Sequence, residues 1–140
     1  MMDAEILDNY RKAGRILAEV LQEAKPKVDV GVPLLEVAEF VEEAIRSKGG
    51  LPAFPCNISL DRSAAHYTPS PKDESVFAEN MVKLDVGVHV DGYIADAAIT
   101  IDLSGHEDLA LASQAGLDAA LELVGPGVST ADIGGAIEEA

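Results

Sequence analysis

The sequence predicts one α+β domain in which an antiparallel β-hairpin packs on amphipathic helices. Two observations support this fold class: apolar residues recur with helical spacing near the N-terminus, and two β-rich runs flank the dipeptide Asp91-Gly92. With 140 residues, 48% of them hydrophobic, the chain is long enough for one modest domain with a core. It is too short to argue for two.

The first two helices are predicted from a buried stripe and from the residues that interrupt it. In the first helix, apolar side chains recur every three or four positions from Ile6 to Ala24, and the segment from Lys25 to Gly31 ends the pattern. We expect Pro33 in the first turn of the second helix, where a proline is favoured. Gly49-Gly50 stops that helix.

Two further helices are predicted in the C-terminal third of the chain. Apolar spacing places one roughly from Glu107 to Val124, and Gly125-Pro126-Gly127 ends it. Ser129 or Thr130 can cap the helix that follows, because a side-chain hydroxyl there accepts a hydrogen bond from a free backbone N–H.

The β-structure is predicted from residue 57 onward, after a loop dense in proline. A short strand covers Asn57 to Leu60, and the hairpin pairs Met81 to Val90 with Tyr93 to Leu103. Asp91-Gly92 favours a two-residue type I′ turn, so residues whose numbers sum to 183 should lie opposite one another.

This register sorts the hairpin side chains onto two faces. The apolar face, which must pack against helices, takes Val86, Val88, Val90, Tyr93, Ala95, Ala97, Ile99 and Ile101. The other face is unusually polar and takes Asp85, Gly87, His89, Ile94, Asp96, Ala98, Thr100 and Asp102.

Asp85 and Asp96 are diagonal neighbours on the polar face, where backbone separations are about 7–8 Å. Gly87, directly opposite Asp96, leaves a gap between strands for lack of a side chain. Two carboxylates this close repel each other, so a divalent cation is one natural resolution. The alternative is that both are solvated on an open sheet face. The pattern alone also leaves His89 open as a ligand.

Composition excludes several classes of partner. Twenty-five acidic residues against ten basic ones give a net charge of −15, which opposes binding to nucleic acid or to an anionic membrane. Neither a secretory h-region nor a membrane-spanning apolar run is found in the sequence, which predicts a cytoplasmic protein. The single cysteine, Cys56, cannot form an intramolecular disulfide or a cysteine metal cluster.

One internal similarity bears on domain organisation. Residues 31–44 align without gaps on residues 127–140, at a constant offset of 96, and each copy follows a long helix. A Gly-Val turn before an amphipathic helix is common, so chance similarity stays open. If the repeat is genuine, a second copy begins near residue 127 and its strands and hairpin would follow Ala140.

Three motifs, taken in order, resemble the type II methionine aminopeptidases, particularly archaeal ones. They are Pro52-Ala53-Phe54-Pro55-Cys56-Asn57-Ile58-Ser59, then Ala64-Ala65-His66-Tyr67-Thr68-Pro69, then the hairpin segment from Lys83 to Asp96. The resemblance covers essentially the whole chain. It implies an α+β pita-bread fold of two related halves, with residues 1–140 as the N-terminal half.

The resemblance also implies roles for individual residues. Asp85 and Asp96 would be metal ligands, with Asp96 bridging two divalent ions, and His89 would not be a ligand. His66 would be the catalytic histidine that reaches the substrate near the scissile carbonyl, and Phe54 would line the pocket for the terminal methionine. The implied reaction is attack by metal-activated water on the carbonyl after an N-terminal methionine. Cobalt, manganese, iron or zinc would suit such ligands.

The site implied by the resemblance is incomplete in this chain. The family's remaining ligands, one His and two Glu, come from the second half, so we expect the chain to be inactive alone. Three interpretations follow: half of an enzyme that acts on N-terminal methionine, a half-fold that forms a homodimer, and a non-catalytic peptide-binding module. Asp85, Asp96 and His66 favour the enzyme, because a binding module would not need them.

Overall fold

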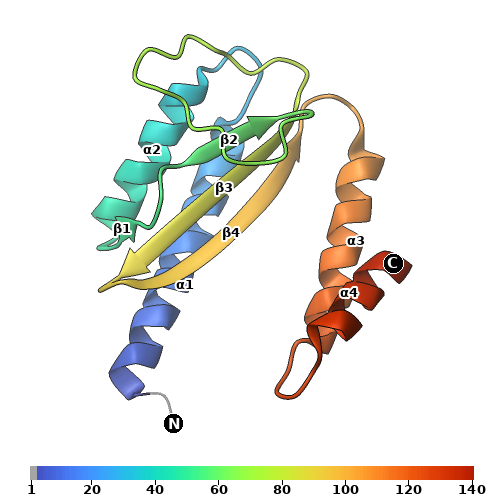
Figure 1. Ribbon diagram of the computed structural model, residues 1–140. Helices are drawn as coiled ribbons and strands as arrows, with labels where there is room; N and C mark the ends of the chain where they lie inside the picture. The colour runs from blue at the N-terminus through green and yellow to red at the C-terminus, as the bar shows by residue number, and fades with distance from the viewer. Residues whose placement is uncertain (1–2) are drawn as a thin grey trace. The chain divides into compact units, whose positions relative to one another are not determined.

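Helices α1 (Ala4–Ala24) and α2 (Leu34–Ser47) pack on a small antiparallel sheet in the N-terminal part of the chain (Figure 1). The computed structural model describes residues 3–140. It divides into two compact units, Met1–Ser104 and Gly105–Ala140. The first unit also contains the short 3-10 helix η1 and four strands: η1 (Lys25–Lys27), β1 (Leu51–Pro52), β2 (Asn57–Leu60), β3 (Met81–Val90) and β4 (Tyr93–Asp102).

Strand β3 is the centre of the sheet. Strand β4 pairs with it along its whole length on one edge. Strands β1 and β2 share the other edge, where β1 pairs at residues 88–89 and β2 at residues 82–85. The sequence prediction found β2 with its correct bounds but missed β1, which lies in the proline-rich loop.

The predicted hairpin register is confirmed. The pairs run from Val90 opposite Tyr93 to Met81 opposite Asp102, so every pair sums to 183. Asp91 and Gly92 have φ angles of 51° and 85°, and two successive left-handed residues are what a type I′ turn requires. The turn therefore determines which residues share a face.

The predicted apolar face of the hairpin lies against α1, which contacts both β3 and β4. Val86, Val88 and Ile101 are buried, whereas Ala97 on the same face is exposed. The core that they join continues into α1, α2 and β2. Its largest fully buried side chains are Phe77, Leu34, Ile45, Ile58, Leu84, Val20, Val37, Val41, Val82, Val86 and Val88.

The start of α2 differs slightly from the sequence prediction. Pro33 is the residue before the helix, with an extended backbone at ψ 136°, and the first helical residue is Leu34. At the other end, Gly49 has a φ of 81°, a conformation that glycine adopts without steric cost. The predicted stop at Gly49-Gly50 is confirmed.

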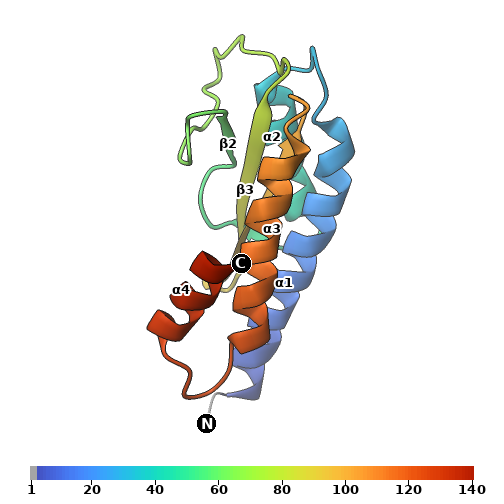
Figure 2. The same cartoon turned by 90° about the vertical axis from the view of Figure 1, so that its right-hand side faces the viewer.

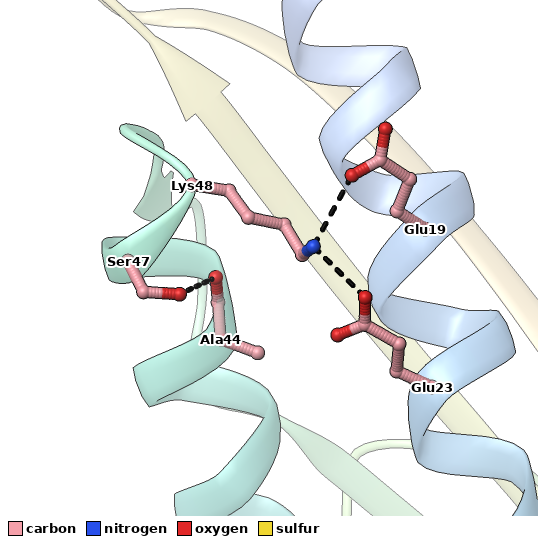
Figure 3. Close-up of polar contacts among 5 residues, drawn as sticks. All are labelled: Glu19, Glu23, Ala44, Ser47 and Lys48. Carbon is pink, nitrogen blue, oxygen red and sulfur yellow. Dashed lines mark hydrogen bonds and ion pairs between the residues drawn. The ribbon is translucent and has the colours of Figure 1, made fainter.

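A lysine just after α2 ties this helix to α1 (Figure 3). Lys48 Nζ lies 3.2 Å from a Glu19 carboxylate oxygen and 2.9 Å from one of Glu23. In the last turn of α2, the Ser47 hydroxyl donates a hydrogen bond of 2.9 Å to the carbonyl of Ala44. The lysine contacts link the two helices, whereas the Ser47 hydrogen bond lies within α2.

The second unit is a pair of packed helices, α3 (Glu107–Leu123) and α4 (Thr130–Glu139) (Figure 2). Gly127 has a φ of 87°, against 86° for Gly31, and the helices that follow begin at Thr130 and Leu34, again 96 positions apart. The Ser129 side chain caps α4 by accepting from the N–H of Ala131. Both copies thus begin with a left-handed glycine and a helix, and the internal repeat stays a prediction.

Most large apolar side chains of the second unit are exposed. Only Gly116 and Ala120 are buried along α3, and no residue described in α4 is. The exposed ones are Leu109, Leu111, Leu117, Leu121, Leu123, Val124, Val128 and Ile137.

Within residues 3–140, no helix is both long and apolar enough to span a membrane.

Candidate metal centre

The candidate site lies on the face of the β3–β4 hairpin that points away from α1. Asp85 is half-buried in the middle of β3, and Asp96 is exposed on β4, directly opposite Gly87. Because residues alternate between faces along a strand, both carboxylates share the face that the sequence predicted to be polar.

The two carboxylates lie close enough to influence each other's ionisation. Desolvation raises the pKa of Asp96 above its ordinary value, and the charge of Asp85 and the hydrogen bond to it raise that pKa further. Two close carboxylates repel each other, and a divalent cation between them would relieve that repulsion, so the pair suits a metal.

The Phe54 ring packs on Gly87. Ring atoms Cδ1, Cε1 and Cζ are the nearest neighbours that a β-carbon at position 87 would meet. The space predicted beside Asp96, where Gly87 has no side chain, is therefore filled by the Phe54 ring. A hydrogen bond of 2.9 Å from Ala53 N to Gly87 O extends the pairing of β1 and holds the loop in place. Phe54 thus forms an apolar wall next to the carboxylates.

Strand β2 adds a buried amide to the same face. Asn57 pairs directly with Asp85, so the two side chains point to the same side of the sheet, and only 9% of Asn57 is exposed. The preceding residue, Cys56, is also buried. Burial, followed by the charges of Glu42 and Asp85, raises the pKa of the Cys56 thiol to about 12, so this cysteine is neutral.

His66 lies in the exposed loop between β2 and β3, with a left-handed φ of 66°. The next residue is fixed to β2, because Ile58 N donates a 2.7 Å hydrogen bond to the carbonyl of Tyr67. The Tyr67 hydroxyl donates a 2.6 Å hydrogen bond to Asp73 across the loop. In the part of the chain that the structure describes, the imidazole of His66 forms no hydrogen bond or ion pair.

His89 has a structural role at the hairpin turn. Its Nδ1 accepts a hydrogen bond of 3.1 Å from Gly92 N. This nitrogen is therefore occupied in stabilising the type I′ turn, and the expectation that His89 is not a ligand stays a prediction.

Sequence reasoning missed two residues next to Asp85: Asn57, which pairs with it, and Thr68, which binds Asn57. The Thr68 hydroxyl donates a 2.7 Å hydrogen bond to Oδ1 of Asn57. Extending the face analysis from β3 to β2 would have placed Asn57 on the polar face. Thr68 had no such signal, because its position depends on how the loop after β2 folds back.

The residues present fit part of a divalent-metal site. Two adjacent carboxylates are the oxygen ligands that such ions take in proteins. Among the described residues 3–140, however, no group of three or more His, Cys, Asp or Glu side chains lies close enough to hold a metal. Asp85 and Asp96 could therefore supply only part of a metal's ligand set.

Comparison with known proteins identifies the family. The sequence model of metallopeptidase family M24 matches residues 8–140, which is nearly the whole chain. The chain belongs to this family. The predicted fold class is confirmed with it: the chain is an α+β half of the M24 pita-bread fold.

The most informative relatives are archaeal methionine aminopeptidases. Those of Archaeoglobus fulgidus and Methanocaldococcus jannaschii are 51% and 48% identical to this M24 chain over 140 residues, which cover 99% of the chain and 48% of each relative. The crystal structure of methionine aminopeptidase from Thermotoga maritima superposes with a TM-score of 0.90 at 24% identity, covering 99% of this chain and 60% of that one. The chain thus spans about half the length of the archaeal relatives.

Proposed function

We propose that this chain is the N-terminal half of the catalytic domain of a methionine aminopeptidase, which removes N-terminal methionine from peptides and nascent proteins. The contact between Asp85 and Asp96 carries the proposal, because two adjacent carboxylates on an otherwise core-forming hairpin have a clear use as metal ligands. The 51% identity to a methionine aminopeptidase supports the substrate. In this proposal the second half of the domain supplies the remaining ligands, and the protein is cytoplasmic.

Each residue of the site has a distinct task in the proposed reaction. Asp85 and Asp96 hold divalent ions, which supply Lewis acidity and lower the pKa of water when bound. The Phe54 ring packed on Gly87 forms an apolar wall suited to a methionine side chain. His66 approaches the substrate near the scissile carbonyl, from a loop that the Tyr67 hydrogen bonds fix against β2.

A non-catalytic peptide-binding module is the competing function. It would use the Phe54 wall without any need for a carboxylate pair, in which desolvation and then the charge of Asp85 raise the pKa of Asp96. The two functions therefore differ in whether the chain binds divalent metal.

Calorimetric titration with Mn²⁺ or Co²⁺ distinguishes them. We expect weak binding by the 140-residue chain and loss of binding in an Asp85→Asn, Asp96→Asn double variant. Asp91→Asn is the matched control, because Asp91 lies in the turn of the same hairpin, away from the pair, and asparagine tolerates its left-handed φ of 51°. Equal metal binding by the double variant and the native chain would overturn the proposal.

A further inference from the structure

A hydrogen bond from Thr68, on the outer edge of β2, orients the Asn57 carboxamide. The segment at Tyr67 and Thr68 runs along the edge of β2 that faces away from β3, where Ile58 N donates to the carbonyl of Tyr67. From there the Thr68 hydroxyl donates to Asn57 Oδ1 at 2.7 Å. Because the oxygen and nitrogen of a carboxamide lie on opposite sides of its carbon, Nδ2 is turned toward β3.

The residue that faces Nδ2 from β3 is Asp85, the register partner of Asn57. Side chains directly opposite in an antiparallel pair have β-carbons about 4.5–5.5 Å apart, which is within reach of an amide-to-carboxylate hydrogen bond. Among residues 3–140 the Asn57 side chain has no hydrogen bond other than the one to Thr68. Nδ2 thus keeps both hydrogens without a protein acceptor. Because no fully buried side-chain nitrogen or oxygen among the described residues lacks a partner, this nitrogen reaches solvent.

We propose that Asn57 is a positioning residue for Asp85, donating an Nδ2 hydrogen bond to its carboxylate when the pair holds a divalent cation. The inference rests on the proposed function. The Asp85 carboxylate has two oxygens, so one can hold the cation while the other accepts from Asn57. Hydrogen bonds to ligating carboxylates fix their orientation, and losing one lowers metal affinity by roughly 10–100-fold.

The test uses the 140-residue chain and Mn²⁺ alone as the probe, with affinity measured by calorimetry. We expect Asn57→Ala to weaken Mn²⁺ binding by roughly 10-fold or more. Thr68→Val, which frees the amide to rotate, should give a smaller loss that Thr68→Ser restores. Asn80→Ala is the matched control, because the Asn80 amide donates to Asp61, outside the Asp85–Asp96 pair.

A spectroscopic readout separates positioning from general destabilisation. The chain has three asparagines and two glutamines, so the side-chain amide signals are few enough to assign in a ¹H–¹⁵N spectrum. On addition of diamagnetic Zn²⁺, the Asn57 amide protons should shift. The Asn80 amide, which already donates to Asp61 at 2.7 Å, should not.

The possible outcomes are distinct. If Asn57→Ala and Thr68→Val bind Mn²⁺ as the native chain does, while the double aspartate variant does not bind, the positioning role is wrong and the metal site stands. If Asn57→Ala fails to fold, the Thr68→Val variant is the test, because the Thr68 side chain lies outside the core. Weaker Mn²⁺ binding by Thr68→Val supports the positioning role, and native binding overturns it. If the native chain binds no metal, both the site and this inference fail.

Discussion

A β-carbon added to Gly87 would lie 2.7 Å from Cδ1 and 2.9 Å from Cζ of the Phe54 ring. Real β-carbons do not approach other atoms this closely, so position 87 must lack a side chain if Phe54 is to lie beside the aspartates. The glycine is required for close packing here, and not for an unusual backbone angle.

The first prediction concerns this contact. Gly87→Ala should displace the ring and destabilise the fold by about 1–3 kcal/mol, the usual cost of overpacking. It should be measured by urea unfolding. Gly14→Ala is the control, because nothing lies within 4 Å of a β-carbon there and alanine favours the helix by about 0.5–1 kcal/mol. Equal stability of the Gly87→Ala variant and the native chain would contradict the packing.

The second prediction concerns Lys48, whose pKa is raised above 10.5 by its hydrogen bonds to Glu23 and Glu19. A raised pKa means that the folded state binds the proton more tightly than the unfolded state. The stabilisation is therefore complete below pH 10.5 and is lost as the pH rises through the folded-state pKa. Lys48→Met should lower stability at pH 7, and the difference from the native chain should shrink above pH 10.5 and in high salt.

Arg11→Met is the matched control for Lys48. The Arg11 guanidinium lies 3.8 Å from Asp8, with side chains that are 62% and 76% exposed, so solvent screens this pair. Arg11→Met should therefore cost little stability at any pH, and the gap between the two variants should narrow above pH 10.5. A Lys48→Met variant whose deficit is constant from pH 7 to pH 11 would show that the lysine acts through packing alone.

The hairpin could be predicted from sequence because its determinants are local. Asp91-Gly92 specifies the turn, the turn specifies the register, and alternation then places Asp85 and Asp96 on one face. Their individual roles as ligands came from the family resemblance and stay a prediction.

What was missed depends on contacts between segments distant in sequence. The loop that carries Phe54 is positioned by pairing with residues 87–89, more than thirty positions away, which no local pattern encodes. For the same reason, the hydrogen bond from Thr68 to Asn57 could not be foreseen. The proline-rich sequence around Pro52 argued against a strand there, yet two residues suffice at the edge of a sheet.

The third prediction is that the 140-residue chain does not hydrolyse Met-Ala-type peptides. Asp85 and Asp96 leave each ion with too few protein ligands, and no further cluster lies among the described residues. Release of methionine in the presence of Mn²⁺ or Co²⁺ should stay at the level of the metal alone. Metal-dependent turnover by a verified monomer would show that two carboxylates suffice.

The fourth prediction is that the isolated chain associates with itself. Strand β4 pairs with β3 alone within residues 3–140, so its other edge is open to pairing. The second unit exposes a row of leucines on α3, among them Leu117 and Leu121 at 50% and 60%. A second copy of the chain can cover either surface in a two-fold dimer.

Light scattering behind size exclusion, with and without a chelator, tests this association and what drives it. If two Asp85–Asp96 pairs meet in the dimer, their repulsion makes association metal-dependent, and EDTA should dissociate it. If apolar surface drives it, Leu121→Glu should dissociate the dimer, whereas Leu51→Glu, at a 53% exposed leucine on β1, should not. A dimer insensitive to EDTA would keep the exposed-surface argument and reject a shared metal centre. A monodisperse monomer under both conditions would defeat the prediction, because the open edge of β4 and the α3 leucines would then be stable in water.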